Sequence, residues 1–257
     1  MRSTYSKVII ILMLVILLPS CHRKAIRQED VKNRHNLIIV PFKAPPVAIM
    51  SWGAGTFILG GAVGASMVDA ATRGGRERIV DTLNSNAGPW EPSNVVAQEC
   101  LDLIKNRAFS QIENISIVEA REMPGLESIH TKGSKVFTAE PQIYAFGSPW
   151  MQSGNRMLKG KSHIQYQKEY PQSSADWALE VFSTYIHIRK LKKISFNVFL
   201  KLVETTSGNK VALDYFYDEF SISLEKDISN FKLFEDEFRS AARQICSRVL
   251  SKIGLIY

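Results

Sequence analysis

The chain has 257 residues, of which 45% are hydrophobic and 22% charged, and its formal net charge is +7. This composition is that of a globular protein, and it excludes wholesale disorder, a collagen-like repeat and a polytopic membrane protein. Three cysteines are too few for a disulfide scaffold and have no metal-ligand spacing. The length allows one large domain or two small ones.

The N-terminus predicts export. Arg2 and Lys7 precede an apolar run at residues 8–18, which is shorter than the roughly twenty residues of a membrane-spanning helix and is typical of a secretory signal. The run ends in the sequence LPSC at residues 18–21, which resembles a bacterial lipobox. In that motif the cysteine, here Cys21, is acylated and becomes the first residue of the mature chain. An ordinary signal peptide that contains a cysteine is the alternative.

The lipobox implies how the mature chain is held. We expect removal of residues 1–20, a lipid anchor on Cys21 and a polar tether that ends at residue 35. The residue after the anchor is His22 rather than Asp, which in bacterial lipoproteins implies the outer membrane, with the chain facing the periplasm. Cleavage removes two basic residues and lowers the net charge from +7 to +5. With no basic stripe in addition, nucleic acid is excluded as a partner.

Residues 36–257 are predicted to form a single α/β domain. A β-branched apolar run at 36–42 predicts a buried strand, and a second strand is expected at 115–119. A polar helix is expected at 69–84, broken by Gly74 and Gly75. A cleaner helix at 93–108 has Ser93 or Asn94 as its predicted N-cap and an apolar face formed by Val96, Cys100, Leu103 and Ile104.

Residues 44–68 contain no charged side chain and are rich in glycine. Gly60 and Gly64 are four residues apart, a spacing that lets helices approach closely in a membrane or an oligomer. A helix packed on the domain itself is the other interpretation. Gly53 and Gly55 follow a strand, but the third glycine of a dinucleotide fingerprint and the Lys-Ser/Thr pair of a P-loop are both missing, so a nucleotide site is not expected.

The C-terminal third predicts a three-stranded antiparallel meander and a closing helix. One face of the first strand carries Trp177, Leu179, Val181 and Tyr185. The second strand alternates between Ile194, Phe196, Val198, Leu200 and Leu202 on one face and Ser195, Asn197 and Lys201 on the other. A turn at 205–209 leads to the third strand, which carries Val211, Leu213, Tyr215 and Tyr217. The helix at 230–252 has a stripe of Phe234, Phe238, Ala241, Ile245 and Val249. The predicted fold is a mixed sheet covered by amphipathic helices.

These elements resemble a group of periplasmic α/β lipoproteins. The resemblance rests on the lipobox, the IIVPF strand at 38–42, ADWALEV at 175–181, FNVFLKLVE at 196–204 and Ser207-Gly208 in the hairpin. The group includes the lipoprotein activators of penicillin-binding proteins, the curli secretion lipoprotein and the amino-terminal domain of TolB. Its members share no active site that could be transferred, so the resemblance implies a fold and an envelope location. The Gly-rich segment and the long insertion at 121–174 depart from the group.

The sequence does not favour an enzyme. There is no Gly-x-Ser-x-Gly elbow, and the Ser-x-x-Lys spacing of Ser207 and Lys210 falls on a hairpin tip without a Lys-Thr-Gly partner. The five histidines show no metal-ligand spacing, and His187 is expected on a solvated loop face. We therefore expect no catalysis, no cofactor and no metal. Cys100 and Cys246 are either two core thiols or, if their helices pack together, a disulfide worth about 4 to 5 kcal/mol.

The insertion at 121–174 shows no sustained periodicity, and a connection this long inside a compact domain is usually functional or disordered. Its aromatic residues are interleaved with basic ones, and Tyr144, Trp150, Tyr166 and Tyr170 are predicted contacts for a protein partner. The alternative is that these aromatics cover the open face of the sheet. The predicted function is a non-catalytic adaptor or accessory protein that binds an envelope partner. An oligomeric, membrane-associated secretion or pore component that uses residues 44–68 is the alternative.

Overall fold

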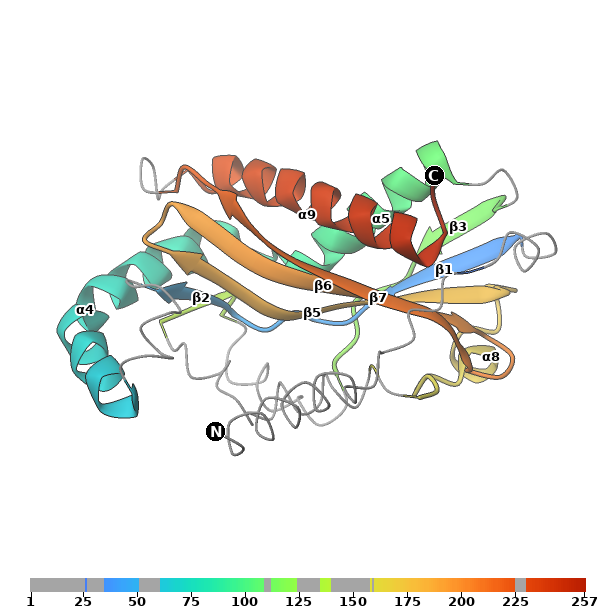
Figure 1. The fold of residues 1–257 in the computed structure, drawn as a ribbon, viewed down its shortest axis with the longest axis horizontal. Helices are drawn as coiled ribbons and strands as arrows, with labels where there is room; N and C mark the ends of the chain where they lie inside the picture. Colours follow the sequence, from blue (N-terminus) through green and yellow to red (C-terminus); the bar gives the residue numbers. More distant parts are fainter. Residues whose placement is uncertain are drawn as a thin grey trace, which may run out of the picture.

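The structure is a computed structural model. It describes Ile26 and residues 35–50, 61–108, 112–123, 135–139, 158, 160–224 and 230–257, with the backbone alone for 61–73 and 184–185. Seven strands form one mixed sheet (Figure 1). They are β1 (Asn36–Pro41), β2 (Val47–Met50), β3 (Asn114–Ile117), β4 (Phe137–Thr138), β5 (Trp177–Arg189), β6 (Lys193–Glu204) and β7 (Lys210–Ser221). The helices are α4 (Gly61–Ala87), α5 (Pro92–Arg107), α8 (Tyr166–Glu169) and α9 (Phe231–Ile253).

The long strand β5 organises the sheet. On one edge it pairs in parallel first with β1 and then with β2, and these two strands pair in turn with β3 and β4. On its other edge β5 starts the antiparallel meander β5–β6–β7. The predicted fold class, a mixed sheet with a C-terminal three-stranded meander and helices on it, is therefore confirmed. The sequence analysis did not predict β2 and β4.

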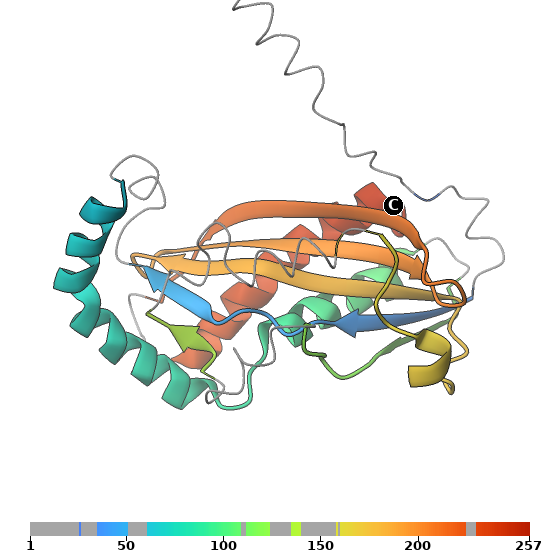
Figure 2. The same cartoon turned by 90° about the horizontal axis from the view of Figure 1, so that it is seen from below.

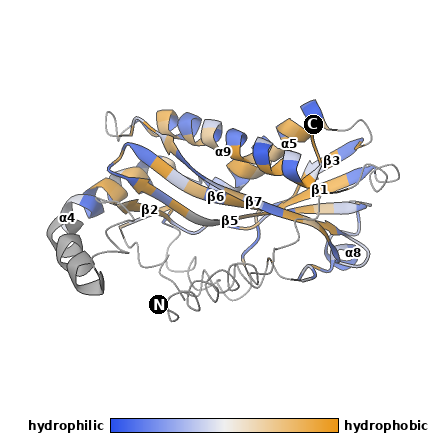
Figure 3. Ribbon diagram, in the orientation of Figure 1, coloured by the Kyte–Doolittle hydropathy of each residue, from blue (hydrophilic) through white to orange (hydrophobic). Residues whose placement is uncertain are grey.

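Helices α5 and α9 lie side by side across one face of the sheet, which we call the helix face (Figure 1). The predicted stripe of α9 is buried there in full, and the helix alternates between hydrophobic and hydrophilic residues along its turns (Figure 3). The Asn230 side chain accepts a hydrogen bond from the Leu233 amide at 3.2 Å and caps the helix. Gly254 ends it at φ 82°, and a Cβ there would lie 3.1 Å from the Ile26 carbonyl oxygen, so any other residue would be strained and crowded.

Two helix predictions were wrong in detail. Helix α4 continues through Gly74 and Gly75 to Ala87, because glycine weakens a helix without necessarily ending it. Helix α5 begins one residue earlier than predicted, with Pro92 at its first position, and its cap is Glu91 rather than Ser93 or Asn94. The predicted apolar face of α5 is buried as expected.

We call the opposite side of the sheet the open face. Which residues of β5 lie on each face changes along the strand. Strand β5 has one extra residue relative to β6 between Phe182 and Tyr185, a β-bulge. After it, Ile186 and Ile188 continue the apolar layer of Leu179 on the helix face. The predicted grouping of Trp177, Leu179 and Val181 on one face is confirmed, whereas the side chain of Tyr185 lies outside the described part of the chain.

The segment at 44–68 is not one packed helix. It contains β2, its residues 51–60 lie outside the described part of the chain, and α4 starts at Gly61. The first turns of α4 extend beyond the end of the sheet in both ribbon views (Figures 1 and 2). Within the described residues, no helix has the length and apolar content needed to cross a membrane.

Candidate functional site

A cleft of about 390 Å³ opens where β1 and β3 end, beside the first turn of α5. Ligands of α/β sheets commonly bind outside the carboxyl ends of parallel strands, which makes this position a natural candidate. The residues that give the cleft its chemistry are Lys43, Trp90, Glu91, Glu119, Glu122 and Lys135.

Backbone hydrogen bonds and one carboxylate build this cleft. Beyond the ends of the strands, the Arg121 amide donates to the Pro41 carbonyl at 2.9 Å, and the Lys43 amide donates to the Arg121 carbonyl at 2.8 Å. Glu91 Oε1 accepts from the Ala44 amide at 3.1 Å and from the Ser93 amide at 3.2 Å. The cap of α5 thus also fixes the chain that leaves β1, so the cleft is preorganised.

The charges at the cleft have both signs. Lys43 Nζ lies 2.6 Å from Glu122 Oε1, and this hydrogen bond is the main cause that raises the pKa of Lys43. Trp90 supplies an aromatic wall, held by edge contacts to Phe234 and Phe238 at ring-centroid distances of 5.6 and 5.1 Å. Mixed charges beside an aromatic surface suit the binding of a polar ligand or peptide.

The open face contains a fully buried ion pair. Lys201 Nζ lies 3.2 Å from Glu180 Oε2, and both side chains have zero exposure. The Tyr166 hydroxyl donates to Glu180 Oε1 at 2.8 Å, and Ser162 Oγ bonds to the same oxygen. Burial, followed by the nearby Glu180 charge, raises the pKa of Tyr166 far above its ordinary value, so its hydroxyl stays a donor. Lys201 lies on the face opposite Ile194 and Leu202, as predicted, and the side chain is buried there.

His187 is also buried on the open face, at the far end of the meander. It has zero exposure and pairs across the strands with Ser195, which is equally buried. Burial, followed by the nearby Arg189 charge, lowers the pKa of His187 to about 4, so its imidazole is neutral at physiological pH. The expectation of a solvated loop was wrong because β5 extends past His187 to Arg189.

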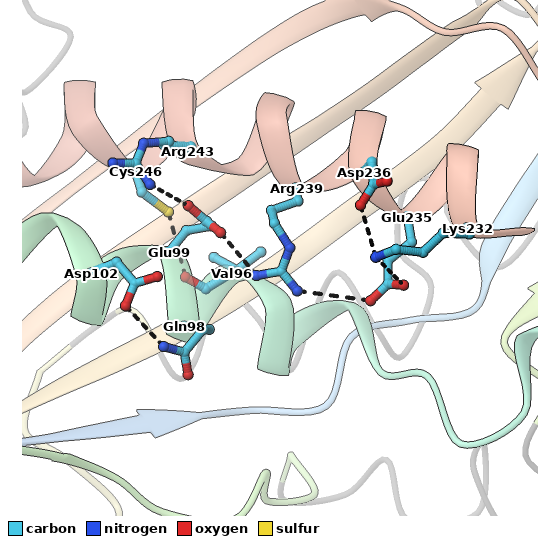
Figure 4. A network of polar contacts seen from close by, with 10 residues as sticks. All are labelled: Val96, Gln98, Glu99, Asp102, Lys232, Glu235, Asp236, Arg239, Arg243 and Cys246. Carbon is cyan, nitrogen blue, oxygen red and sulfur yellow. Dashed lines mark hydrogen bonds and ion pairs between the residues drawn. The ribbon is translucent and has the colours of Figure 1, made fainter.

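Figure 4 shows the polar contacts that join α5 to α9 on the helix face. The Glu99 carboxylate, 3% exposed, accepts from Arg239 at 3.0 Å and from Arg243 at 3.2 Å. Two arginines one turn apart on α9 thus hold one carboxylate of α5, which fixes the register of the two helices.

Cys100 and Cys246 lie in the same interface between α5 and α9. Cys246 Sγ lies 3.7 Å from the Val96 carbonyl oxygen, and both thiols are buried and free. Burial, followed by a hydrogen bond with Cys246, raises the pKa of Cys100 well above its ordinary value. The packing of the two helices was the condition set for a disulfide, and this condition is met. The disulfide itself stays a prediction.

The predicted partner contacts have different fates. Of these, Tyr144 and Trp150 lie outside the described residues, as do the predicted lipid anchor Cys21 and Gly60, one of the two predicted oligomer or membrane contacts. The other, Gly64, lies in α4 where only the backbone is described. Tyr166 is 2% exposed, which is wrong for a partner contact and fits the alternative that these aromatics cover the open face. Tyr170 is half-buried, and its hydroxyl accepts from Arg121 at 3.1 Å.

Strand β7 carries an exposed aromatic surface that was not predicted from the sequence. Tyr215 and Tyr217 on β7 are 49% and 50% exposed, and Tyr215 stacks on Phe199 at 4.9 Å between ring centroids. Strand β7 pairs with β6 alone among the described strands and is twelve residues long. Alternation assigned these tyrosines to a strand but could not tell a covered face from an uncovered one.

Neither the protein-family profiles nor the curated proteins that were searched match this chain. Among solved structures, it is similar to the PelC dodecamer from Paraburkholderia phytofirmans at 8% identity and a TM-score of 0.33, covering 87% of this chain and 90% of that chain. The hypothetical protein CT253 from Chlamydia trachomatis has 9% identity and a TM-score of 0.32 over 85% and 93% of the two chains. The lipoprotein GNA1162 from Neisseria meningitidis has 12% identity and a TM-score of 0.26 over 82% and 99%. At these TM-scores, the likeness carries no argument about this chain.

Proposed function

We propose that this protein is an outer-membrane lipoprotein, anchored through Cys21 and facing the periplasm, that binds an envelope protein partner without catalysing a reaction. The lipobox-like sequence at residues 18–21 supports the location. The exposed tyrosines of β7 are the observation that carries the partner binding.

Strand β7 has two properties of a protein-docking edge. Its outer backbone groups face away from β6, and such groups template the addition of another strand. Tyr215 and Tyr217 lie two residues apart, so they share one face and present two large aromatic surfaces there. Tyrosine is enriched at binding hot spots, because it buries a large area with few rotamers to order.

The test places a photo-crosslinking amino acid at position 215 in cells and, as a control, at position 257, where Tyr257 is 66% exposed on another surface. We expect one envelope protein to be captured from position 215 and not from position 257. In the unlabelled chain, Tyr215→Ala with Tyr217→Ala then lowers co-purification of that protein at least tenfold, and Tyr257→Ala leaves it unchanged. Equal capture from both positions would refute β7 as the contact.

The anchor has its own test. The mass of the protein extracted from membranes should be that of a chain that begins at an acylated Cys21. An intact N-terminal methionine without acyl groups would remove the proposed location.

The projecting start of α4 favours a second candidate, an oligomer that uses residues 44–68 between subunits or at the bilayer. Gly64 lies in these first turns, which extend beyond the sheet (Figure 1). Light scattering of the detergent-extracted protein should then show a large assembly that Gly64→Leu dissociates. Gly75→Leu, further along the same helix, serves as the control. A monomer in both cases would refute this candidate.

A further inference from the structure

Ile26 lies between the predicted lipid anchor and the first strand, and it is docked on the folded domain. Its amide donates to the Ile253 carbonyl at 3.0 Å, at the C-terminal end of α9. Its side chain is half-buried and packs against the core of the helix face. Burial of an apolar side chain and pairing of a backbone amide both favour this docked position over a solvated one.

The end of α9 that receives Ile26 is fixed by its own hydrogen bonds. The Gly254 amide donates to the Ser251 carbonyl at 3.1 Å, and the Leu255 amide donates to the Leu250 carbonyl at 3.0 Å, which are the two bonds of a Schellman motif. A Cβ at position 254 would lie 3.5 Å from the Ile26 amide nitrogen and closer still to its carbonyl oxygen. The glycine therefore allows the close approach of the docked residue.

Docking shortens the tether between the anchor and the domain. Five residues link Cys21 to Ile26, and an extended chain of that length spans at most about 17 Å. Without docking, the tether would run over fifteen residues to Asn36 and span at most about 50 Å. Helix α9 has 23 residues and is about 34 Å long. The docked tether is therefore shorter than this helix, and the undocked tether would be longer.

We propose that the docked Ile26 fixes which end of the domain meets the bilayer, so that the C-terminal end of α9 forms a surface against the lipid headgroups. The inference rests on the proposed function, because the acyl anchor on Cys21 supplies the membrane. A tether shorter than α9 keeps this end at the bilayer, whereas a tether longer than α9 would let either end approach it.

This orientation separates another surface from the membrane. In both ribbon views, the first turns of α4 lie at the end of the sheet opposite the C-terminus (Figures 1 and 2). Gly64, which lies in these turns, is then held away from the anchoring bilayer. Of the two contacts considered for this part of the chain, a neighbouring subunit is within its reach and the anchoring bilayer is not.

The experiment uses the acylated chain, reconstituted into phosphatidylcholine vesicles that contain an acceptor dye on a lipid headgroup. A donor dye is attached in turn to Ser251→Cys, Ser240→Cys and Leu233→Cys. These positions are exposed and follow one face of α9, since spacings of 11 and 18 residues are about three and five whole turns. Positions 240 and 233 lie about 16 and 27 Å from position 251 along the helix. Cys100 and Cys246 are buried, so the dye reports the introduced thiol.

We expect energy transfer to fall at least about twofold from position 251 to position 233, with position 240 between them, because the distance to the acceptor layer rises along the helix. Two changes should flatten this gradient. Ile26→Asp places a charge in the apolar contact, and ten Gly/Ser residues inserted after position 23 lengthen the tether to about that of the undocked chain. Ile26→Val keeps an apolar β-branched side chain and should keep the gradient.

Equal transfer from the three positions of the otherwise unaltered chain, or a gradient in the opposite direction, would overturn the proposal. A gradient that survives both Ile26→Asp and the insertion would also overturn it, because the docked tether would then not choose the end. The insertion leaves the domain itself unchanged, so it decides the matter if the Tm shows that Ile26→Asp destabilises the fold. A chain that mass analysis finds without acyl groups on Cys21 refutes the proposed location, whereas an acylated chain without a gradient refutes this inference alone.

Discussion

The two faces of the sheet are stabilised by different kinds of interaction. On the helix face, aliphatic and aromatic side chains of α5, α9 and the strands form one continuous core. On the open face, a smaller apolar cluster lies beside the buried pair Glu180–Lys201 and the neutral His187. We therefore expect the helix face to be the less sensitive to pH, since the buried ionisable pair Glu180–Lys201 and the buried His187 lie on the open face. The difference teaches that stability and environmental sensitivity are carried by opposite sides of one sheet.

The largest expected loss comes from Phe238 on the helix face. Its ring stacks on Phe196 at 5.1 Å and meets Trp90 edge-on at 5.1 Å between centroids. Phe238→Ala removes these contacts and leaves a cavity, which we expect to lower the free energy of unfolding by about 4 kcal/mol. Urea titration at pH 7 and pH 5 should give the same loss. Leu233→Ala, at an exposed position of the same helix, is the control.

The next largest effect is expected at Lys201 on the open face. Lys201→Met leaves Glu180 buried without its counter-ion and should cost about 3 kcal/mol, the lower end for broken buried pairs, because Tyr166 and Ser162 still donate to the carboxylate. Adding Glu180→Gln removes the stranded charge and should restore most of the loss in the same urea titration. A double variant as unstable as the single one would show that packing, and not charge, holds this site.

The pH dependence of stability is expected to come from His187. Its pKa is about 4 in the folded chain and 6.5 ordinarily, so below pH 6.5 the unfolded chain binds a proton that the folded chain refuses. Stability should therefore fall as the pH drops from about 6.5 to about 4, by at most about 3 kcal/mol. His187→Gln should flatten this part of the pH profile. The exposed His163→Gln should leave the profile unchanged, and a fall that persists in His187→Gln would assign it to other groups.

The smallest effect is expected at the polar contacts between α5 and α9 that Figure 4 shows. Glu99→Gln keeps the shape of the side chain and removes the charge that Arg239 and Arg243 share. Because the two arginines are 39% and 51% exposed, we expect a loss of about 1 to 2 kcal/mol in thermal unfolding. Asp102→Asn on the same helix should change stability by less than about 0.5 kcal/mol. Equal effects would mean that the buried carboxylate has no special role.

The helix face could be predicted from the sequence because its rules are local. The stripe from Phe234 to Val249 and the alternation from Ile194 to Leu202 follow from periods of 3.6 and 2, and both are buried as expected. The open face could not be predicted in this way. Lys201 and His187 look like solvated residues in the sequence. The burial of Lys201 depends on its ion pair with Glu180, a residue of another strand, which no local pattern predicts.

The candidate site shows the same limit. The cleft joins residues near positions 43, 91 and 120, and the spatial meeting of three loops has no periodic signature. Tyr215 was assigned to its strand, but its exposure depends on what the rest of the chain places over that strand.

The bulge in β5 reverses which residues, odd-numbered or even-numbered, lie on each face of the sheet. Before it, even-numbered residues such as Glu180 and Phe182 face one way, and after it the odd-numbered His187 does so instead. Deleting a single residue between Phe182 and Tyr185 would shift the second half by one step. The His187 imidazole and the Arg189 guanidinium would then point into the apolar core beneath α9, while Ile186 and Ile188 would point to the open face. The one extra residue of the bulge thus decides on which face of the sheet each later residue of β5 lies.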